Sequence, residues 1–306
     1  MQIGNIKLKS RVFLAPMMEI TSLPYRLLCR KYGAGMTYSE MIVANSLVSN
    51  PKLDSAKTAK EEKPVGLQLA GNNSELILRA AKTADFDLVD LNFGCPSDKV
   101  AGNDMCSSLL EKPEKIGKII SYLVDNLDKP VTAKIRLGYK TKTYMKVAEA
   151  VEKAGASAIC LHGRTAEEHY DIEADWKAIC EVKKKIGIPV IGNGDVFDGE
   201  SAKELLKKVD FVMVGRAAIG NPFVFDRINR YLKNGEIADK PNLEEKYKCF
   251  LEYVKLCEKY GFNKFTRIRR MSLSFAKNVP NSAKLREKLS GCKSIDEIKR
   301  EFEEFI

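Results

Sequence analysis

The sequence predicts a (β/α)8 barrel followed by a small all-helical C-terminal domain. Short β-rich runs alternate with helical patterns through about the first 220 residues, as in a series of right-handed βα units. There are eight such runs, and eight parallel strands close into a barrel, whereas an open doubly wound sheet usually has fewer. Beyond about residue 234 the β-rich runs stop and only helical patterns remain. A barrel takes about 250 residues, so the 306 residues of this chain leave room for one small further domain.

The predicted strands follow one another at spacings of roughly 20 to 45 residues. They cover residues 12–17, 36–41, 65–70, 88–93, 131–137, 158–163, 189–194 and 211–216. Helical patterns lie between them, for example at residues 74–83, 143–154 and 200–208. Asn73 or Ser74 suits the N-cap of the first of these helices, and Gly155 suits the end of the second.

A linker marked by Asn234-Gly235 and Pro241-Asn242 precedes the C-terminal region. We therefore expect a barrel domain over residues 1–234 and a helical domain over residues 243–306. The predicted helices cover residues 243–260, 264–278, 282–290 and 294–306. In the second of them we expect one apolar set to face a core, namely Phe265, Ile268, Leu273 and Phe275. The basic set expected to face outward comprises Arg267, Arg269 and Arg270.

The composition excludes several classes of protein. The N-terminus has no basic and apolar secretory signal, and no apolar run approaches the roughly 18 residues of a membrane span. The eight cysteines form no CxxC pair, which argues against a zinc ribbon, and the missing secretory signal argues against a disulfide framework. Only two histidines are present, so chemistry built on several histidines is excluded. We expect a soluble, cytoplasmic, monomeric protein with reduced thiols and without a metal site.

The distribution of charge points to a polyanionic partner. The net charge is +10, and eight Lys or Arg residues stand between Lys264 and Lys288 against the single acid Glu287. A run of like charges is usually a solvated face, but an excess of this size is equally typical of a nucleic-acid footprint.

Polar residues stand at the C-terminal ends of successive predicted strands, where barrel enzymes carry their active sites. Gln68 and Asn92 offer amides that donate and accept hydrogen bonds at once, which suits a flat heterocycle or ordinary bonding at the barrel mouth. Lys134 fits a Schiff-base lysine, a cation beside an electron-rich ring, or a rim charge. His162 fits a ligand contact or a structural role.

The last two strands end in glycine clusters that predict a phosphate site. Asn193-Gly194-Asp195 and Gly215-Arg216 follow strands seven and eight, where barrels of this kind bind phosphate through backbone N–H groups. Arg216 can add a forked, charge-assisted contact. The glycines could instead serve tight turns alone, but their presence after both strands favours the phosphate site.

Cys95 is the best single candidate for chemistry. It lies just after strand four, between Gly94 and Pro96, on a bend that would hold its sulfur at the mouth. A free thiol with an ordinary pKa of about 8.5 keeps its proton at neutral pH and can act as a general acid. A buried, unreactive cysteine is the alternative, although packing explains a loop position less well.

These motifs, taken in order, resemble those of the tRNA-dihydrouridine synthases of the bacterial B type, which are flavin barrels with a helical RNA-binding domain. The most specific stretch is Val89-Asp90-Leu91-Asn92-Phe93-Gly94-Cys95-Pro96, followed by Lys99-Val100. The resemblance runs from Ala15 to about Asn221 and continues more weakly around residues 267–270. The other matching motifs are Ala15-Pro16-Met17 with Thr21, Ser39-Glu40-Met41, Gln68-Leu69-Ala70-Gly71, Lys134-Ile135-Arg136-Leu137-Gly138, His162-Gly163-Arg164-Thr165, Ala174-Asp175-Trp176, Gly192-Asn193-Gly194-Asp195 and Gly215-Arg216-Ala217.

The resemblance implies an FMN-dependent oxidoreductase that reduces uridines in tRNA, with NADPH as reductant and Cys95 as the proton donor to C5 of the uracil. The residues that it implies for FMN are Pro16, Met17, Met18, Gln68, Lys134, His162, Asn193, Gly194, Asp195, Gly215 and Arg216. Those that it implies for the RNA substrate are Asn92, Arg136, Arg267, Arg269 and Arg270. The basic helical domain would contact tRNA, in agreement with the charge distribution.

Three positions depart from the family pattern. Cys106 stands where a Gly is common, Ala166 where an Arg usually follows His-Gly-Arg-Thr, and Ile172 where a Gly is common. Because the last two lie on a loop expected to touch substrate, they bear on which RNA is modified. Cys106 could pair transiently with Cys95, but a small packed residue explains it better. The alternatives are a dihydrouridine synthase acting on rRNA, a flavin barrel acting on a small pyrimidine-like molecule, a Schiff-base barrel, and an RNA chaperone with an idle site.

Overall fold

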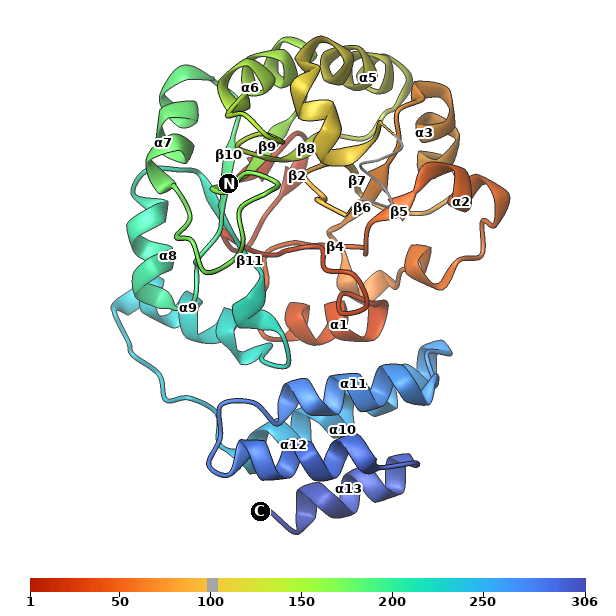
Figure 1. Cartoon of the computed structure of the whole chain (residues 1–306), viewed down its shortest axis with the longest axis vertical. Coiled ribbons are helices and arrows are strands. Elements are labelled where there is room, and N and C mark those ends of the chain that lie inside the picture. Colours follow the sequence, from red (N-terminus) through yellow and green to blue (C-terminus); the bar gives the residue numbers. More distant parts are fainter. Residues whose placement is uncertain (98–103) are drawn as a thin grey trace.

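The computed structural model describes residues 1–97 and 104–306, which form a barrel ringed by helices and a helical region packed against one side of it (Figure 1). The barrel strands are β3 (Val12–Leu14), β4 (Thr37–Tyr38), β6 (Val65–Ala70), β7 (Leu88–Phe93), β8 (Val131–Arg136), β9 (Ala158–His162), β10 (Val190–Asn193) and β11 (Phe211–Val214). Each falls within a predicted run, so the predicted barrel is confirmed.

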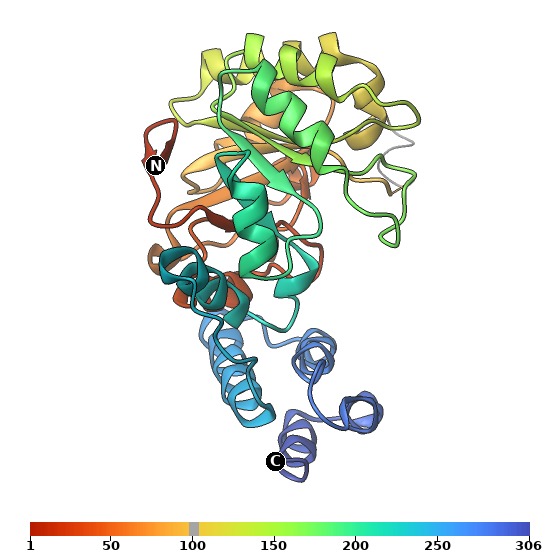
Figure 2. The same cartoon turned by 90° about the vertical axis from the view of Figure 1, so that its left-hand side faces the viewer.

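The strands run parallel in the order β3-β11-β10-β9-β8-β7-β6-β4, and a short strand β5 (Ile42–Val43) pairs with β6. Two backbone hydrogen bonds close the barrel between β3 and β4, from Leu14 N to Met36 O (3.0 Å) and from Gly35 N to Val12 O (2.8 Å). Glycine is required at position 35, since a Cβ there would lie 2.2 Å from the Ser10 carbonyl oxygen. An antiparallel pair, β1 (Gln2–Ile3) and β2 (Ile6–Lys7), lies near the N-terminal ends of the strands (Figure 2).

Amphipathic helices surround the barrel and bury their apolar faces against it. They are α1 (Leu23–Lys31), α2 (Ala44–Ser49), α3 (Ser74–Ala81), α5 (Pro113–Asn126), α6 (Tyr144–Lys153), α7 (Trp176–Lys185), α8 (Gly199–Leu206) and α9 (Phe223–Asn234). Asn73 caps α3 by accepting a hydrogen bond from Leu76 N, as predicted, and Gly155 follows the end of α6 with a φ of +85°. Short 3-10 turns cover Asp54–Ala56, Lys60–Glu62, Cys106–Glu111 and Arg216–Ala218.

The interior of the barrel changes from apolar to polar along its axis. At the N-terminal end the inward side chains are apolar, and the rings of Phe13 and Phe211 stack with centroids 4.9 Å apart. Toward the C-terminal end they become polar, beginning with Gln68, Asp90 and Thr132, which are neighbours in register on β6, β7 and β8. Burying polar groups is costly unless they are hydrogen-bonded, so this end of the barrel is built for contacts other than packing.

The C-terminal region contains α10 (Leu243–Tyr260), α11 (Phe265–Phe275), α12 (Ser282–Gly291) and α13 (Ile295–Glu303). Helix α10 packs on α1, where the rings of Tyr25 and Tyr253 lie edge to face at 6.3 Å and Lys31 pairs with Glu252 at 2.6 Å. In Figure 2, α11 and α12 lie on the same side of the molecule as the loop that follows β9, and α10 lies on the opposite side. The division into two domains at residues 234 and 243 remains a prediction.

The predicted orientation of α11 is partly wrong. Ile268 and Phe275 are buried as expected, but Phe265 and Leu273 are only half-buried, and Ser272 and Ser274 are buried instead. Arg267 does not face outward, since its guanidinium lies 5.1 Å from the Phe262 ring centroid and its Nη1 is buried. The reason is that α11 packs against α10, α12 and α13 together, which leaves it no broad solvent face.

In the part of the chain that the structure describes, every helix is too short or too polar to cross a membrane.

The buried Lys246 should make the stability of the fold depend on pH. Its Nζ donates to the carbonyl of Lys277 (2.5 Å), and burial lowers its pKa to about 8. The unfolded chain, with an ordinary lysine pKa of about 10.4, then binds more protons between about pH 8 and 10, so the free energy of unfolding rises with pH in that window. We expect the free energy of unfolding of the wild type, measured in urea relative to that of Lys246→Met, to increase by about 2 kcal/mol between about pH 7.5 and 9.5. A difference that stays constant with pH would contradict this.

Candidate active site at the barrel mouth

A cavity of about 670 Å³ opens at the C-terminal ends of the barrel strands. It brings together almost all of the residues predicted for the site. They are Pro16, Met17, Met18, Gln68, Asn92, Cys95, Lys134, Arg136, His162, Asn193, Gly194, Asp195, Gly215 and Arg216. They come from the ends of β3, β6, β7, β8, β9, β10 and β11 or from the loops that follow, because parallel strands place all of their C-terminal ends at one rim.

On one wall, two amides are held by a buried carboxylate. Gln68 Nε2 donates to Asp90 Oδ2 (2.7 Å), and Thr132 Oγ1 donates to Asp90 Oδ1 (2.7 Å). The Gln68 Oε1 in turn accepts from Asn92 Nδ2 (2.8 Å). The Gln68 backbone N–H is held by the Ser39 hydroxyl (2.9 Å). Both amides are thus fixed in orientation before any ligand binds.

The loop that carries Cys95 is fastened from three directions. Asn92 Oδ1 accepts from the backbone N–H groups of Gly94 (3.0 Å) and Cys95 (2.8 Å). Ser107 Oγ donates to the Cys95 carbonyl (2.8 Å), and Arg136 Nε donates to the Gly94 carbonyl (2.9 Å). These bonds hold the half-buried Cys95 at the cavity wall. The matching Lys99-Val100 lie outside the described residues.

Cys106 lies behind this loop, at the position where a Gly is common in the family. Its φ is +53°, in the left-handed region that favours glycine, which accounts for the usual residue there. The side chain is buried, with Sγ 3.8 Å from Met41 Sδ, and burial raises the pKa of its thiol to about 12. A packed, protonated thiol describes Cys106 better than a reactive one.

Lys134 reaches across the cavity floor from β8. Its Nζ donates to Asn193 Oδ1 (3.0 Å), and Asn193 Nδ2 donates to the Met213 carbonyl (2.8 Å). An ammonium has three protons to donate. Among the described residues the Lys134 ammonium donates one of these protons, to Asn193, so it can also donate to a ligand without moving.

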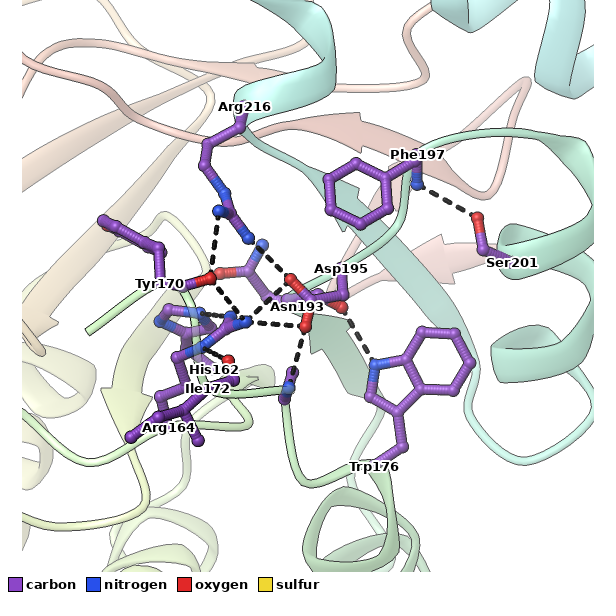
Figure 3. Close-up of polar contacts among 12 residues, drawn as sticks. His162, Arg164, Tyr170, Ile172, Trp176, Asn193, Asp195, Phe197, Ser201 and Arg216 are labelled. Atoms are coloured by element: carbon purple, nitrogen blue, oxygen red, sulfur yellow. Dashed lines mark hydrogen bonds and ion pairs between the residues drawn. The ribbon is translucent and has the colours of Figure 1, made fainter. Parts of the chain in front are cut away.

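On the opposite wall, Asp195 gathers the loops that follow β9, β10 and β11 (Figure 3). Both of its carboxylate oxygens accept from Arg164 Nη2 (2.9 and 2.6 Å), Oδ1 also accepts from Arg216 Nη2 (2.6 Å), and Oδ2 accepts from Ala174 N (2.7 Å). Burial alone raises the pKa of Asp195, but these donors and both guanidinium charges keep it below its usual range. The carboxylate is therefore ionised and engaged with protein groups, and the cofactor contact predicted for Asp195 remains a prediction.

His162 lies among cations. Arg164 Nη1 is 3.3 Å from its Nε2, and burial together with the charges of Lys134, Arg136, Arg164 and Arg216 holds the pKa of the imidazole well below its usual range. The ring is therefore neutral at physiological pH and can donate or accept one hydrogen bond at each nitrogen, according to its tautomer. Arg164 and Arg216 on this wall, with Lys134 and Arg136 nearby, outnumber the single carboxylate of Asp195 and make this side of the cavity suitable for an anion.

Sequence reasoning gave Arg164 no role and missed Tyr170 and Phe197. Arg164 is only 1% exposed and connects Asp195 to the loop after β9, through bonds from Nε to the Ile172 carbonyl (2.6 Å) and from Nη2 to Asp195. Tyr170 and Phe197 are exposed at the rim, with ring centroids 4.5 and 5.6 Å from the Arg216 guanidinium. Arg164 belongs to a motif that the sequence did single out, but nothing in that motif indicates its burial.

The three arginines predicted to contact RNA do not line the cavity and lie on α11 instead. Arg270 is exposed and paired with Glu19 of the loop after β3. Arg269 is half-buried, donates to the Cys292 carbonyl (3.3 Å) and lies over the Phe265 ring. Any RNA contact by α11 is therefore separate from the cavity.

The sequence of the chain matches a known protein family and known relatives. Residues 13–306 match the model of the family described as dihydrouridine synthase (Dus). A probable tRNA-dihydrouridine synthase of Rickettsia conorii is 36% identical over 297 residues, which is 93% of this chain and 90% of that protein. The tRNA-dihydrouridine synthase B of Vibrio vulnificus is 38% identical over 287 residues, 88% of this chain and 87% of the relative.

Solved structures resemble the fold at low sequence identity. A histamine dehydrogenase from Rhizobium sp. 4-9 has a TM-score of 0.58 at 14% identity, over 84% of this chain. The 6-hydroxypseudooxynicotine amine oxidase of Pseudomonas geniculata has a TM-score of 0.61 at 14% identity, also over 84%. The chain spans 50% and 52% of the length of these two structures, and the likeness concerns the fold alone.

Removing the Asp195 carboxylate should destabilise the barrel strongly. Arg164 would then be left as a buried charge without its carboxylate partner, which typically costs about 3 to 5 kcal/mol. We expect Asp195→Ala to lower the free energy of unfolding by about 3 kcal/mol in urea titrations, since Asp195 itself is partly exposed. The control is Asp226→Ala, which breaks an exposed pair with Arg230 and should cost less than about 1 kcal/mol. Equal losses for the two variants would show that Arg164 does not depend on Asp195.

Proposed function

We infer that the enzyme reduces specific uridines of tRNA to 5,6-dihydrouridine in the cavity at the barrel mouth, because this chain belongs to the dihydrouridine synthase family. The family makes the chain an oxidoreductase that acts on tRNA. The finer proposal is that FMN is the cofactor, NADPH the reductant and Cys95 the proton donor. The observation that carries it is the convergence of a pinned cysteine, two oriented amides and an anion-binding wall in one cavity.

The residues present fit an FMN. The wall formed by His162, Arg164 and Arg216 presents positive charge and a neutral imidazole, which suits a phosphate. Glycine is required at position 194, because a Cβ at its φ of +110° would lie 2.7 Å from Ala174 Cβ and 3.0 Å from the His162 ring. Gln68 and Lys134 would meet the polar edge of the ring, and Pro16, Met17 and Met18 its apolar surface. Bound there, FMN would supply a hydride for C6 of the uracil, and NADPH would be the source of that hydride.

Cys95 and the residues around it would complete the reduction. The thiol donates its proton to C5 of the uracil and recovers one from solvent, so that a hydride and a proton together saturate the 5,6 bond. Asn92 and Arg136 hold the Cys95 loop and line the cavity beside it, where a base can be read by hydrogen bonds. Lys134 places a positive charge where negative charge develops during transfer.

The helical region would bind the body of the tRNA. Its excess of Lys and Arg over residues 264–288 suits the phosphate backbone. The views place α11 and α12 on the same side as the loop after β9, so one RNA could reach both (Figure 2). We propose residues 1–234 as the catalytic domain and residues 243–306 as the RNA-binding domain of a monomeric cytoplasmic enzyme.

The first test follows the visible absorbance of the flavin without oxygen. We expect NADPH to bleach the band of the purified protein, and tRNA lacking dihydrouridine to restore it. A band that stays bleached would redirect the substrate to rRNA or to a small pyrimidine-like molecule. A protein that shows no flavin band even after FMN is added would refute the proposal.

Replacing the thiol should separate chemistry from binding. We expect Cys95→Ala to lower the rate of flavin reoxidation by tRNA by about a hundredfold or more, because general acid catalysis of this size is lost, while tRNA affinity is retained. The control is Cys180→Ala, a half-buried thiol on α7 outside the cavity lining, which should reoxidise at the wild-type rate. Unchanged turnover in Cys95→Ala would remove this residue from the mechanism.

Arg269→Ala and Arg270→Ala test the RNA surface. We expect each to weaken tRNA binding and to reduce the slope of log affinity against log salt by about 1 per lost phosphate contact. Arg230→Ala is the control, because Arg230 is an exposed arginine on α9 that is already paired with Asp226 and Glu236. If affinity and salt slope stayed at wild-type values in all three variants, α11 would not be an RNA surface.

A further inference from the structure

A buried carboxylate and the proton-donor loop are connected by an unbroken row of hydrogen bonds. Asp90, on β7, is only 2% exposed and is not among the residues that line the cavity. It accepts from Gln68 Nε2, Gln68 Oε1 accepts from Asn92 Nδ2, and Asn92 Oδ1 accepts from the N–H groups of Gly94 and Cys95. The row starts inside the barrel and ends at the thiol-bearing residue.

Each amide in the row could be placed in two orientations, because its oxygen and nitrogen have nearly the same shape. An ionised carboxylate accepts hydrogen bonds and cannot donate them. The NH2 of Gln68 must therefore face Asp90, which turns its oxygen to Asn92. The NH2 of Asn92 must then face Gln68, which turns its oxygen to the backbone N–H groups of the loop.

The reversed row would not hold the loop. If the NH2 of Asn92 faced the loop, it would meet the N–H groups of Gly94 and Cys95, and donors would oppose donors. Buried donors left without acceptors are costly, so the loop would move away from its present position. The orientation of the Asn92 amide thus depends on the charge of Asp90, which acts through Gln68.

Both oxygens of the Asp90 carboxylate act as acceptors in the structure. Burial raises the pKa of Asp90, and the hydrogen bonds from Gln68 and Thr132 together with the charge of Lys134 oppose the rise. Thr132 also fills the second carboxylate oxygen, at 2.7 Å. The hydroxyl of Tyr38 is buried nearby but has no hydrogen-bond partner among the described residues, so it lies outside the row.

We propose that Asp90 is a positioning residue for Cys95: its carboxylate sets the orientation of the Gln68 and Asn92 amides and so holds the Cys95 loop at the cavity wall. The proposal rests on the proposed function only for its effect on turnover. The position of the loop can be measured without flavin or RNA, from the reactivity of the Cys95 thiol.

The experiment combines two readouts on four variants. The first is the rate of alkylation of Cys95 by iodoacetamide in the folded protein, quantified on the Cys95 peptide by mass spectrometry. The second is kcat and KM for tRNA. The variants are Asp90→Asn, Gln68→Ala, the double variant Asp90→Asn with Gln68→Glu, and the control Tyr38→Phe.

In Asp90→Asn the carboxylate becomes an amide that can face Gln68 with its NH2, so the row can reverse. We expect Cys95 alkylation to become at least about threefold faster, because the freed loop exposes the thiol. We expect kcat to fall by about tenfold or more, with KM for tRNA near the wild-type value, because misplacing a reacting group costs rate rather than binding. Gln68→Ala, which cuts the row while keeping the carboxylate, should accelerate alkylation similarly.

The double variant provides the sharpest comparison. The carboxylate introduced at position 68 would accept from the new amide at position 90 on one oxygen and from Asn92 on the other, which restores the orientation of Asn92. We expect its alkylation rate to return to within about twofold of wild type, as should that of Tyr38→Phe. The kcat of the double variant should stay low, because a carboxylate at position 68 has no N–H to donate to the flavin ring.

Two outcomes would overturn the proposal. One is a folded Asp90→Asn or Gln68→Ala protein whose Cys95 is alkylated at the wild-type rate. The other is a double variant whose Cys95 is alkylated no more slowly than that of Asp90→Asn. If the wild type failed to turn over tRNA, the proposed function would fail, but the alkylation rates would still decide whether Asp90 positions Cys95.

Discussion

The architecture of the mouth depends on the ion pair between Asp195 and Arg164. Arg164 is almost completely buried, and a guanidinium in that position requires a carboxylate. Through this pair the loop after β9, held by the Ile172 carbonyl and the Ala174 N–H, is joined to the turn after β10, and Arg216 joins the end of β11 to the same carboxylate. Three loops that are separate in sequence thus act as one rigid wall. The imidazole of His162 lies beside this wall and is neutral because it is buried, an effect to which the charges of Lys134, Arg136, Arg164 and Arg216 add.

The opposite wall uses a different principle. There, neutral amides and backbone groups line the cavity, and a row of hydrogen bonds that starts at the buried Asp90 carboxylate fixes their orientation. Lys134 and Asn193 lie between the two walls and connect β8 to β10 across the floor. A ligand with an anionic end and a flat heteroaromatic end would find each end matched to one wall. The distribution of charge and amides in the cavity would therefore also set the direction in which such a ligand lies.

The sequence was sufficient to predict the barrel and most of the cavity lining. Apolar runs such as residues 65–70 identify the strands, and parallel topology then requires that Gln68, Lys134, His162 and Arg216 converge at one rim. What could not be predicted depends on contacts between separate loops and helices. The ion pair of Asp195 with Arg164 of the preceding loop is one such contact, since no motif in the sequence indicates it. The orientation of Arg267 depends on helices that pack from several sides, a constraint that the periodicity of α11 alone does not contain.

The pairing of the first barrel strand with the last has a consequence for the order in which the molecule is made. Val12 of β3, the first barrel strand, pairs with Val212 of β11, the last one. Most of the barrel strands have therefore left the ribosome before β11 is available to pair with β3. Closing so long a stretch of chain is slow, and until then both edges of the sheet are open to pairing with other chains. Arg164 and Asp195 are likewise synthesised before Arg216. The nascent protein is thus exposed to aggregation and lacks a complete site until the last strand emerges, which makes its synthesis a natural point of dependence on chaperones.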